Sequence, residues 1–261
     1  MRWINLLFVL AINAVPLVGV KYYDWSALTV VALYWMENLL VAVFTCARIL
    51  LHRVLTHKRG HWRTGQLGTK VSDRPSGRGL LGEYATMAFI FTLAHGIFVG
   101  GFVAIASQNH GNEPFWAFSW DQLRRGVTWM AGAMTLEFAI DAATMRSRSF
   151  AWIKAYVGQR MGRVLVMHLT IIFGMWGMMA TESPFAVLYV LIALKSLWDL
   201  ASSTAGAKAA DLPAQPPAWL GKIANSIGKD QGGAAKISAD WQRNVAQMKS
   251  AAIEDEEVMQ G

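Results

Sequence analysis

Residues 25–51 read WSALTVVALYWMENLLVAVFTCARILL, an apolar run long enough to cross a lipid bilayer. The run shows no period-two alternation, so it favours a membrane-spanning helix over a strand of a barrel. Five further apolar segments lie at about residues 3–20, 83–106, 126–145, 164–181 and 184–201. The sequence therefore predicts an all-α integral membrane bundle of about six transmembrane helices.

The composition supports this class. Of the 261 residues, 54% are hydrophobic and only 16% are charged, whereas about a quarter of a soluble domain is charged. These values exclude a soluble enzyme and a soluble nucleic-acid-binding protein. The single cysteine, Cys46, excludes a disulfide framework and a Cys-rich zinc module. Segment 3–20 also resembles a signal peptide, but no small-x-small cleavage site follows it, so we expect a retained helix.

The Lys and Arg residues indicate the orientation, because cytoplasmic loops carry an excess of them. The loops after the second and fourth segments hold twelve, against three in the loops of the opposite side. We therefore expect both termini to be cytoplasmic. The net charge of +7 follows from this topology, and we expect no nucleic-acid partner. The twelve are Arg53, Lys58, Arg59, Arg63, Lys70, Arg74, Arg78, Arg146, Arg148, Lys154, Arg160 and Arg163.

The composition changes after the sixth segment, which divides the chain into a transmembrane domain, 1–203, and a cytoplasmic linker and tail, 204–261. Apolar residues recur at helical spacing around Trp219 and again around Trp241, and predict amphipathic helices. Lys222 and Lys229 beside the first of these suit docking on anionic lipid headgroups. A protein partner for the tail is the alternative. We expect the acidic run 254–257 to be solvated.

Three histidines, His52, His57 and His61, lie among Lys and Arg residues after the second segment. Cationic neighbours disfavour a metal ion there. We expect a solvated basic loop that contacts anionic headgroups.

Ionisable residues inside the predicted spans are the candidates for function, because a charge at the bilayer centre costs roughly 2.5–3.5 kcal/mol. In this set the four acids outnumber the one lysine, which predicts protonated carboxyls, charged histidines or a bound cation. Glu37 stands out because its own helix offers it no nearby cation. The set comprises Glu37, Asn38, His95, Glu137, Asp141, His168, Lys195 and Asp199.

Three chemistries suit these groups. His95, His168 and Glu37 would together bind a divalent metal ion such as zinc. An acid–base enzyme, such as a membrane-embedded hydrolase, would use Glu37 or His95 as its catalytic group. An ion, proton or small-solute carrier would use the same groups as relay positions, joined by the remaining polar residues, Asn38, Glu137, Asp141, Lys195 and Asp199. The structural alternative is that the buried polar residues only hold helices together.

Several short motifs resemble one known family. They are Tyr34-Trp35-Met36-Glu37-Asn38, His95-Gly96, Met167-His168-Leu169-Thr170 and Leu194-Lys195-x-x-x-Asp199. Together they resemble the bacterial membrane family DUF6498, a domain of unknown function, over about residues 1–203. The resemblance implies a multi-pass protein of the bacterial inner membrane and marks these residues, without implying a reaction. Glu137 and Asp141 lie outside the resembling motifs.

Overall fold

The structure is a computed structural model that describes part of the chain. The described residues are 25–67, 72–75, 78–109, 118–181 and 233–259, with short pieces at 15, 18–19, 22–23, 189–190, 193–194 and 196–198. The first and sixth predicted segments, 3–20 and 184–201, therefore lie largely outside the described residues, as do Lys195, Asp199 and the predicted helix around Trp219.

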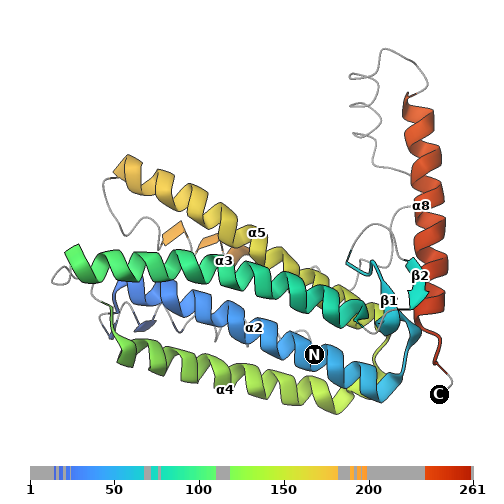
Figure 1. The fold of residues 1–261 in the computed structure, drawn as a ribbon, viewed down its shortest axis with the longest axis horizontal. Helices are drawn as coiled ribbons and strands as arrows, with labels where there is room; N and C mark the ends of the chain where they lie inside the picture. The colour runs from blue at the N-terminus through green and yellow to red at the C-terminus, as the bar shows by residue number, and fades with distance from the viewer. Residues whose placement is uncertain are drawn as a thin grey trace.

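Four long helices lie side by side, with α2 between α3 and α4 (Figure 1). Their bounds are Ala27–Thr56 for α2, Gly79–Asn109 for α3, Trp120–Thr144 for α4 and Phe150–Thr181 for α5. A further helix, α8 (Gly233–Asp255), stands across one end of the bundle and contains the predicted apolar spacing around Trp241. The described residues are mostly helical, which confirms the all-α class.

The short elements gather at the end of the bundle where α8 lies. They are the 3-10 helices η1 (Arg59–Trp62) and η2 (Met145–Ser147) and the strands β1 (Arg63–Thr64) and β2 (Ser72–Pro75). The two strands pair in antiparallel register, with Arg63 opposite Pro75 and Thr64 opposite Ser72.

Within the described residues, two helical stretches, Leu28–Thr56 and Gly79–Gly101, are long and apolar enough to cross a membrane. The predicted spans at 126–145 and 164–181 are helical as α4 and α5. The predicted start of the fifth helix was wrong, since α5 begins at Phe150. Lys154 and Arg160 were assigned to a loop because of their charge, but both lie on α5, where Gln66 and Glu137 accept hydrogen bonds from them.

Linked caps start α2 and α4 at the opposite end of the bundle. Ser26 Oγ accepts a hydrogen bond from the backbone N–H of Thr29 at 3.1 Å, and Ser119 Oγ accepts one from Gln122 at 3.3 Å. Serine at this position satisfies an N–H group that the helix itself leaves unpaired. The N–H of Ser119 also donates to Thr29 Oγ1 at 3.2 Å, which joins the two helix starts.

The bundle is apolar outside as well as inside. One buried cluster joins α2 to α4 around Leu33 and Met130, and another joins α2 to α3 and α5 around Ile49 and Ile153. Large apolar side chains also point outward from α3, where Ile97 is 70% exposed. A helix that is apolar on all sides is typical of a membrane span, and exposed apolar surface on this scale is rare on soluble monomers.

The end of the bundle beside α8 corrects two predictions. His52 and His61 are buried, not solvated as expected for a basic loop. The acidic run 254–257 was expected in solvent, but Asp255 is 2% exposed and Val258 pairs with Lys58 in an antiparallel bridge. The histidine prediction failed because His52 and His61 pack against each other and against the start of α5. The acidic-run prediction failed because the basic residues that neutralise the run lie far from it in the sequence.

A substitution of Gly79 tests how closely residues pack at the end of the bundle beside α8. Its φ of +42° is unfavourable for other residues, and a Cβ there would overlap the carbonyl oxygen of His61. We expect Gly79→Ala to destabilise the protein by about 2 kcal/mol or more, measured as thermal unfolding in detergent. Gly132, where a Cβ would meet nothing within 4 Å, is the control, and Gly132→Ala should leave stability unchanged or raised. Equal effects of the two substitutions would contradict this packing.

Candidate functional site

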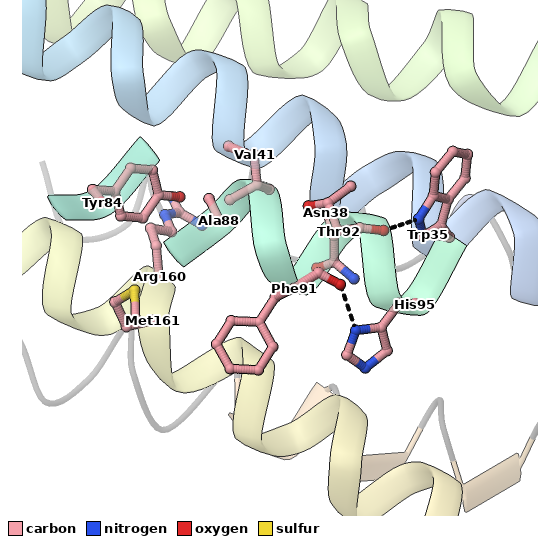
Figure 2. A pocket seen from close by; sticks show the side chains of 11 residues that line it. Trp35, Asn38, Val41, Tyr84, Ala88, Phe91, Thr92, His95, Arg160 and Met161 are labelled. Atoms are coloured by element: carbon pink, nitrogen blue, oxygen red, sulfur yellow. Dashed lines mark hydrogen bonds between the residues drawn. The ribbon is translucent and has the colours of Figure 1, made fainter. Parts of the chain in front are cut away.

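A small cavity lies between α2, α3 and α5 (Figure 2). The volume that the centres of water-sized atoms can occupy is about 40 Å³, and one water needs roughly 10–15 Å³ by this measure. The cavity therefore suits a few waters or a small ion. It is lined by Trp35, Asn38, Val41, Ala42, Tyr84, Ala88, Phe91, Thr92, His95, Arg160 and Met161.

Trp35 holds α2 close to α3 at one side of the cavity. Its indole Nε1–H donates to the carbonyl oxygen of Thr92 at 2.9 Å. A Cβ at position 96 would lie 2.8 Å from the Trp35 ring, so Gly96 makes room for the indole. The Trp35 and His95-Gly96 motifs are thus two sides of one helix contact.

His95 contributes an imidazole ring to the cavity. Its Nδ1 lies 2.7 Å from the carbonyl oxygen of Phe91, and a carbonyl can only accept, so Nδ1 carries the hydrogen. In the neutral ring Nε2 is then the nitrogen that carries no hydrogen. Asn38, one of the predicted site residues, lines the same cavity from α2.

Glu37 is buried in α2, with 1% of its surface exposed. It is not among the residues that line the cavity, since consecutive residues on a helix point about 100° apart. The structure thus brings Asn38 and His95 to one cavity and places Glu37 on another side of α2. The backbone of His168 lies on α5, but its side chain, like Lys195 and Asp199, lies outside the described residues.

Glu137 and Asp141 bind arginines, which corrects the predicted charge imbalance. Arg48, 1% exposed, places Nε 2.9 Å from Asp141 Oδ2 and Nη2 3.6 Å from Glu137 Oε2. Arg160 Nη2 lies 3.4 Å from Glu137 Oε1 and also reaches the cavity. Two carboxylates thus face two guanidinium groups. The predicted excess was wrong for this pair because the set of ionisable residues inside the predicted spans left out Arg48 and Arg160.

Aromatic rings complete the surroundings of these arginines. The Arg48 guanidinium carbon lies 5.4 Å from the centre of the Phe138 ring and 5.2 Å from that of Tyr156. Arg160 lies 4.7 Å from the same Tyr156 ring. Cation–π contacts within about 6 Å stabilise a desolvated cation. We call Arg48, Glu137, Asp141 and Arg160 the ionic cluster.

A polar stripe along α2 was not predicted from the sequence. Asn38, Thr45, Arg48, His52 and Thr56 recur at intervals of seven, three, four and four residues, which places them on one face of a helix. Four of these residues, Thr45 to Thr56, are buried. The helical spacing of these polar residues could have indicated, from the sequence alone, that they share one face of α2.

His52 and His61 form a buried pair at the end of this stripe. His52 Nε2 donates to the carbonyl oxygen of Arg148 at 3.2 Å, so His52 Nδ1 accepts from His61 Nε2 at 2.7 Å. The His61 ring also meets the Phe150 ring edge-on at 5.0 Å. Burial lowers the pKa of His61 to about 3, and the nearby positive charges act in the same direction. The pair therefore fastens the loop after α2 to the start of α5 as neutral imidazoles.

The comparisons with known proteins give a family. A family described as "Family of unknown function (DUF6498)" matches residues 1–216, more than three quarters of the chain. The chain belongs to this family. No curated protein and no solved structure matches it. The DUF6498 match covers the bundle and its site residues and ends before α8, so the docked C-terminal segment lies beyond the family region.

The described residues test the predicted metal site only in part. Among them, no three His, Cys, Asp or Glu side chains lie close enough to bind a metal ion together. Of the predicted ligands, His95 lines the cavity, Glu37 does not, and the side chain of His168 is outside the described residues. The zinc site therefore stays a prediction.

The ionic cluster predicts a measurable coupling. Arg48→Met should destabilise the protein by about 3–5 kcal/mol, because it leaves buried carboxylates without their cation. Adding Asp141→Asn removes the orphaned charge and leaves Glu137 paired with Arg160, so the double variant should recover at least half of the loss. Thermal unfolding in detergent measures both. Additive losses in the double variant would contradict the proposed charge compensation.

The His61 pKa predicts acid sensitivity. Because its pKa is about 3 in the folded protein and 6.5 unfolded, the unfolded state binds the extra proton between these values. Stability is therefore complete above pH 6.5 and should fall by up to about 1.4 kcal/mol per pH unit below it.

His61→Gln keeps a donor to His52 but cannot titrate, so the loss between pH 7 and pH 5 should become smaller in this variant. His57→Gln, at an exposed histidine, is the control and should keep the slope of the parent. A parent whose unfolding temperature is independent of pH over this range would contradict the assignment.

Proposed function

We propose that this DUF6498 protein is a multi-pass membrane protein that moves protons, or a small solute together with protons, through the cavity between α2, α3 and α5. The observation that carries the proposal is the position of His95, whose imidazole lines a small, mostly apolar cavity together with the polar side chains of Asn38 and Arg160. Histidine is the side chain that most readily exchanges a proton near neutral pH.

The distribution of polarity supports the membrane location. Ile97, Phe89 and other large apolar side chains of α3 point outward, while the ionic cluster lies inside. Intramembrane ionisable residues face the bundle interior and mark ion or proton paths. We further propose the bacterial inner membrane, with both termini cytoplasmic. The contact between α8 and η1 supports this orientation, since it keeps the C-terminal helix beside the basic loop.

The size of the cavity favours a proton, water or small ion over a lipid or peptide substrate. Typical pockets for larger ligands measure roughly 300–1,000 Å³. The side chain of Asn38 would orient water on the His95 side of the cavity, while Tyr84 and Arg160 line its other end, where Arg160 connects the cavity to Glu137 of the ionic cluster (Figure 2). The second candidate is a membrane-embedded hydrolase, for which the sequence predicts Glu37 or His95 as the catalytic group.

Proton flux into proteoliposomes tests the proposal. With a pH-sensitive dye inside and an imposed potassium diffusion potential, the parent protein should acidify the lumen. His95→Gln should lower the rate by at least about tenfold, because it removes the protonatable nitrogen. His57→Gln, outside the cavity, should leave the rate unchanged. Flux that is equal in the parent and His95→Gln, or equal to that of empty liposomes, would contradict the proposal.

Metal content separates the carrier from a metalloenzyme. The protein would be purified without chelators or a His-tag, beside a His95→Ala/His168→Ala variant, and measured by mass spectrometry. A carrier of protons should contain no stoichiometric metal. Near-stoichiometric zinc, iron or manganese in the parent, lost in a variant that still folds, would replace the carrier with a metal-dependent enzyme.

A further inference from the structure

The last described residues form an ordered contact with the loop that follows α2. We call residues 254–259 the C-terminal clamp, and Lys58, Arg59 and Arg63 the basic collar. The backbone N–H of Arg59 donates to the carbonyl oxygen of Glu257 at 2.8 Å, and the N–H of Met259 donates to that of His57 at 3.0 Å. The clamp is thus held to the loop by a short ladder of backbone bonds.

Ion pairs accompany this ladder and neutralise the collar. Lys58 pairs with Glu256, and Arg59 Nη1 lies 3.2 Å from Glu257 Oε2. Arg63 Nη1 lies 3.1 Å from Glu254 Oε2 and 3.3 Å from Asp255 Oδ1. Each cation of the collar is therefore paired with at least one carboxylate of the clamp.

The start of α5 adds a further contact. The backbone N–H of Ala151 donates to Glu256 Oε1 at 2.9 Å. Burial opposes the ionisation of Glu256, but Lys58 and the N–H groups of Ala151 and Phe150 together outweigh it, so the pKa of Glu256 lies below its usual value. An anion is stabilised at this position, as expected for basic side chains beside a helix N-terminus.

The buried carboxylate of Asp255, within the clamp, is stabilised by hydrogen bonds and ion pairs but destabilised by its loss of hydration. Asp255 is 2% exposed and accepts a hydrogen bond from Gln66 Nε2 at 3.0 Å. Burial nevertheless raises the pKa of Asp255 above its ordinary value, although Arg63 and Gln66 act against it. Opening the clamp would rehydrate this carboxylate. The desolvation of Asp255 therefore destabilises the closed state, which makes it easier for another anion to displace the clamp.

The collar also lies where lipid phosphates would be, given the membrane location proposed above. Val54 and Leu55, in the last turn of α2, are 63% and 38% exposed and face outward. Lys58 follows the end of this helix by two residues. The headgroup layer extends roughly 5–8 Å beyond the hydrocarbon on each side, which matches this short distance.

We propose that anionic lipid headgroups compete with the C-terminal clamp for the basic collar. In a bilayer rich in anionic lipid, phosphates pair with Lys58, Arg59 and Arg63, while the negative surface repels the acidic clamp. The clamp then opens and releases the end of α8. In a neutral bilayer the clamp stays closed. The inference rests on the proposed membrane location and does not depend on proton transport.

Hydrogen exchange of the full chain in nanodiscs tests this competition. Discs of phosphatidylcholine alone are compared with discs of phosphatidylcholine and phosphatidylglycerol at the same pH and ionic strength. The amides of Arg59, Ala151 and Met259 donate within the clamp contact. They should exchange at least about tenfold faster in the anionic discs, since exchange reports local opening. Amides in the middle of α2 should exchange equally in both.

Variants separate charge from backbone pairing. Glu254→Gln/Glu256→Gln/Glu257→Gln should exchange fast in both lipids, because the collar has lost most of its internal anions. Asp240→Asn, on an exposed part of α8 away from the clamp, should behave as the parent does. Equal protection of the parent in both lipids, stronger protection in the anionic discs, or a triple variant that stays protected would each overturn the proposal.

Failure of the membrane location gives a different result. A chain that does not enter nanodiscs, judged by co-elution with the disc scaffold, contradicts the proposed function and with it the site of competition. A chain that enters the discs but keeps its clamp closed in anionic lipid overturns only the competition. The two failures are therefore distinguished in one experiment.

Discussion

The fold depends on the burial of Arg48 within an apolar bundle. A guanidinium group cannot deprotonate, so its charge must be balanced where it lies. Asp141 and Glu137 of α4 provide that balance, and Arg160 of α5 completes the cluster. This constraint joins α2, α4 and α5 at one depth, and it places Arg160 at the edge of the cavity that holds His95. The charged cluster and the candidate site thus share one residue and one arrangement of helices.

The helices could be predicted from the sequence because each depends on local hydrophobicity. Long apolar runs located the ends of α2, α3 and α4 to within six residues, and the spacing around Trp241 located α8. The start of α5 could not be found in this way, because charged residues such as Lys154 and Arg160 indicate a loop when their partners are unknown. In the structure they lie on α5, where they donate hydrogen bonds to Gln66 and Glu137. A local pattern gives the helix, but the neutralisation of its charges depends on tertiary contacts.

The same limit applies to the candidate site. His95 and Asn38 were identified from their depth in predicted spans, and they do line one cavity. The partners of Glu137 and Asp141 were missed because Arg48 is 93 residues from Asp141 in the sequence. The clamp was missed for a similar reason, as Lys58 and Glu256 are separated by 198 residues. Ion pairs between residues so far apart were not inferred from the sequence. The helical spacing of polar residues along α2 would, however, have indicated that Arg48 and His52 lie on one face of this helix.

The proposed membrane location requires that the apolar outer surface of α3 faces lipid while the polar groups face the bundle interior. Spin labels at Phe89→Cys and Ile97→Cys, in a Cys46→Ala background, test it in proteoliposomes. Power-saturation measurements should show high accessibility to oxygen and low accessibility to an aqueous nickel reagent, with the reverse at exposed His57→Cys. Aqueous accessibility at positions 89 and 97 equal to that at position 57 would contradict the account.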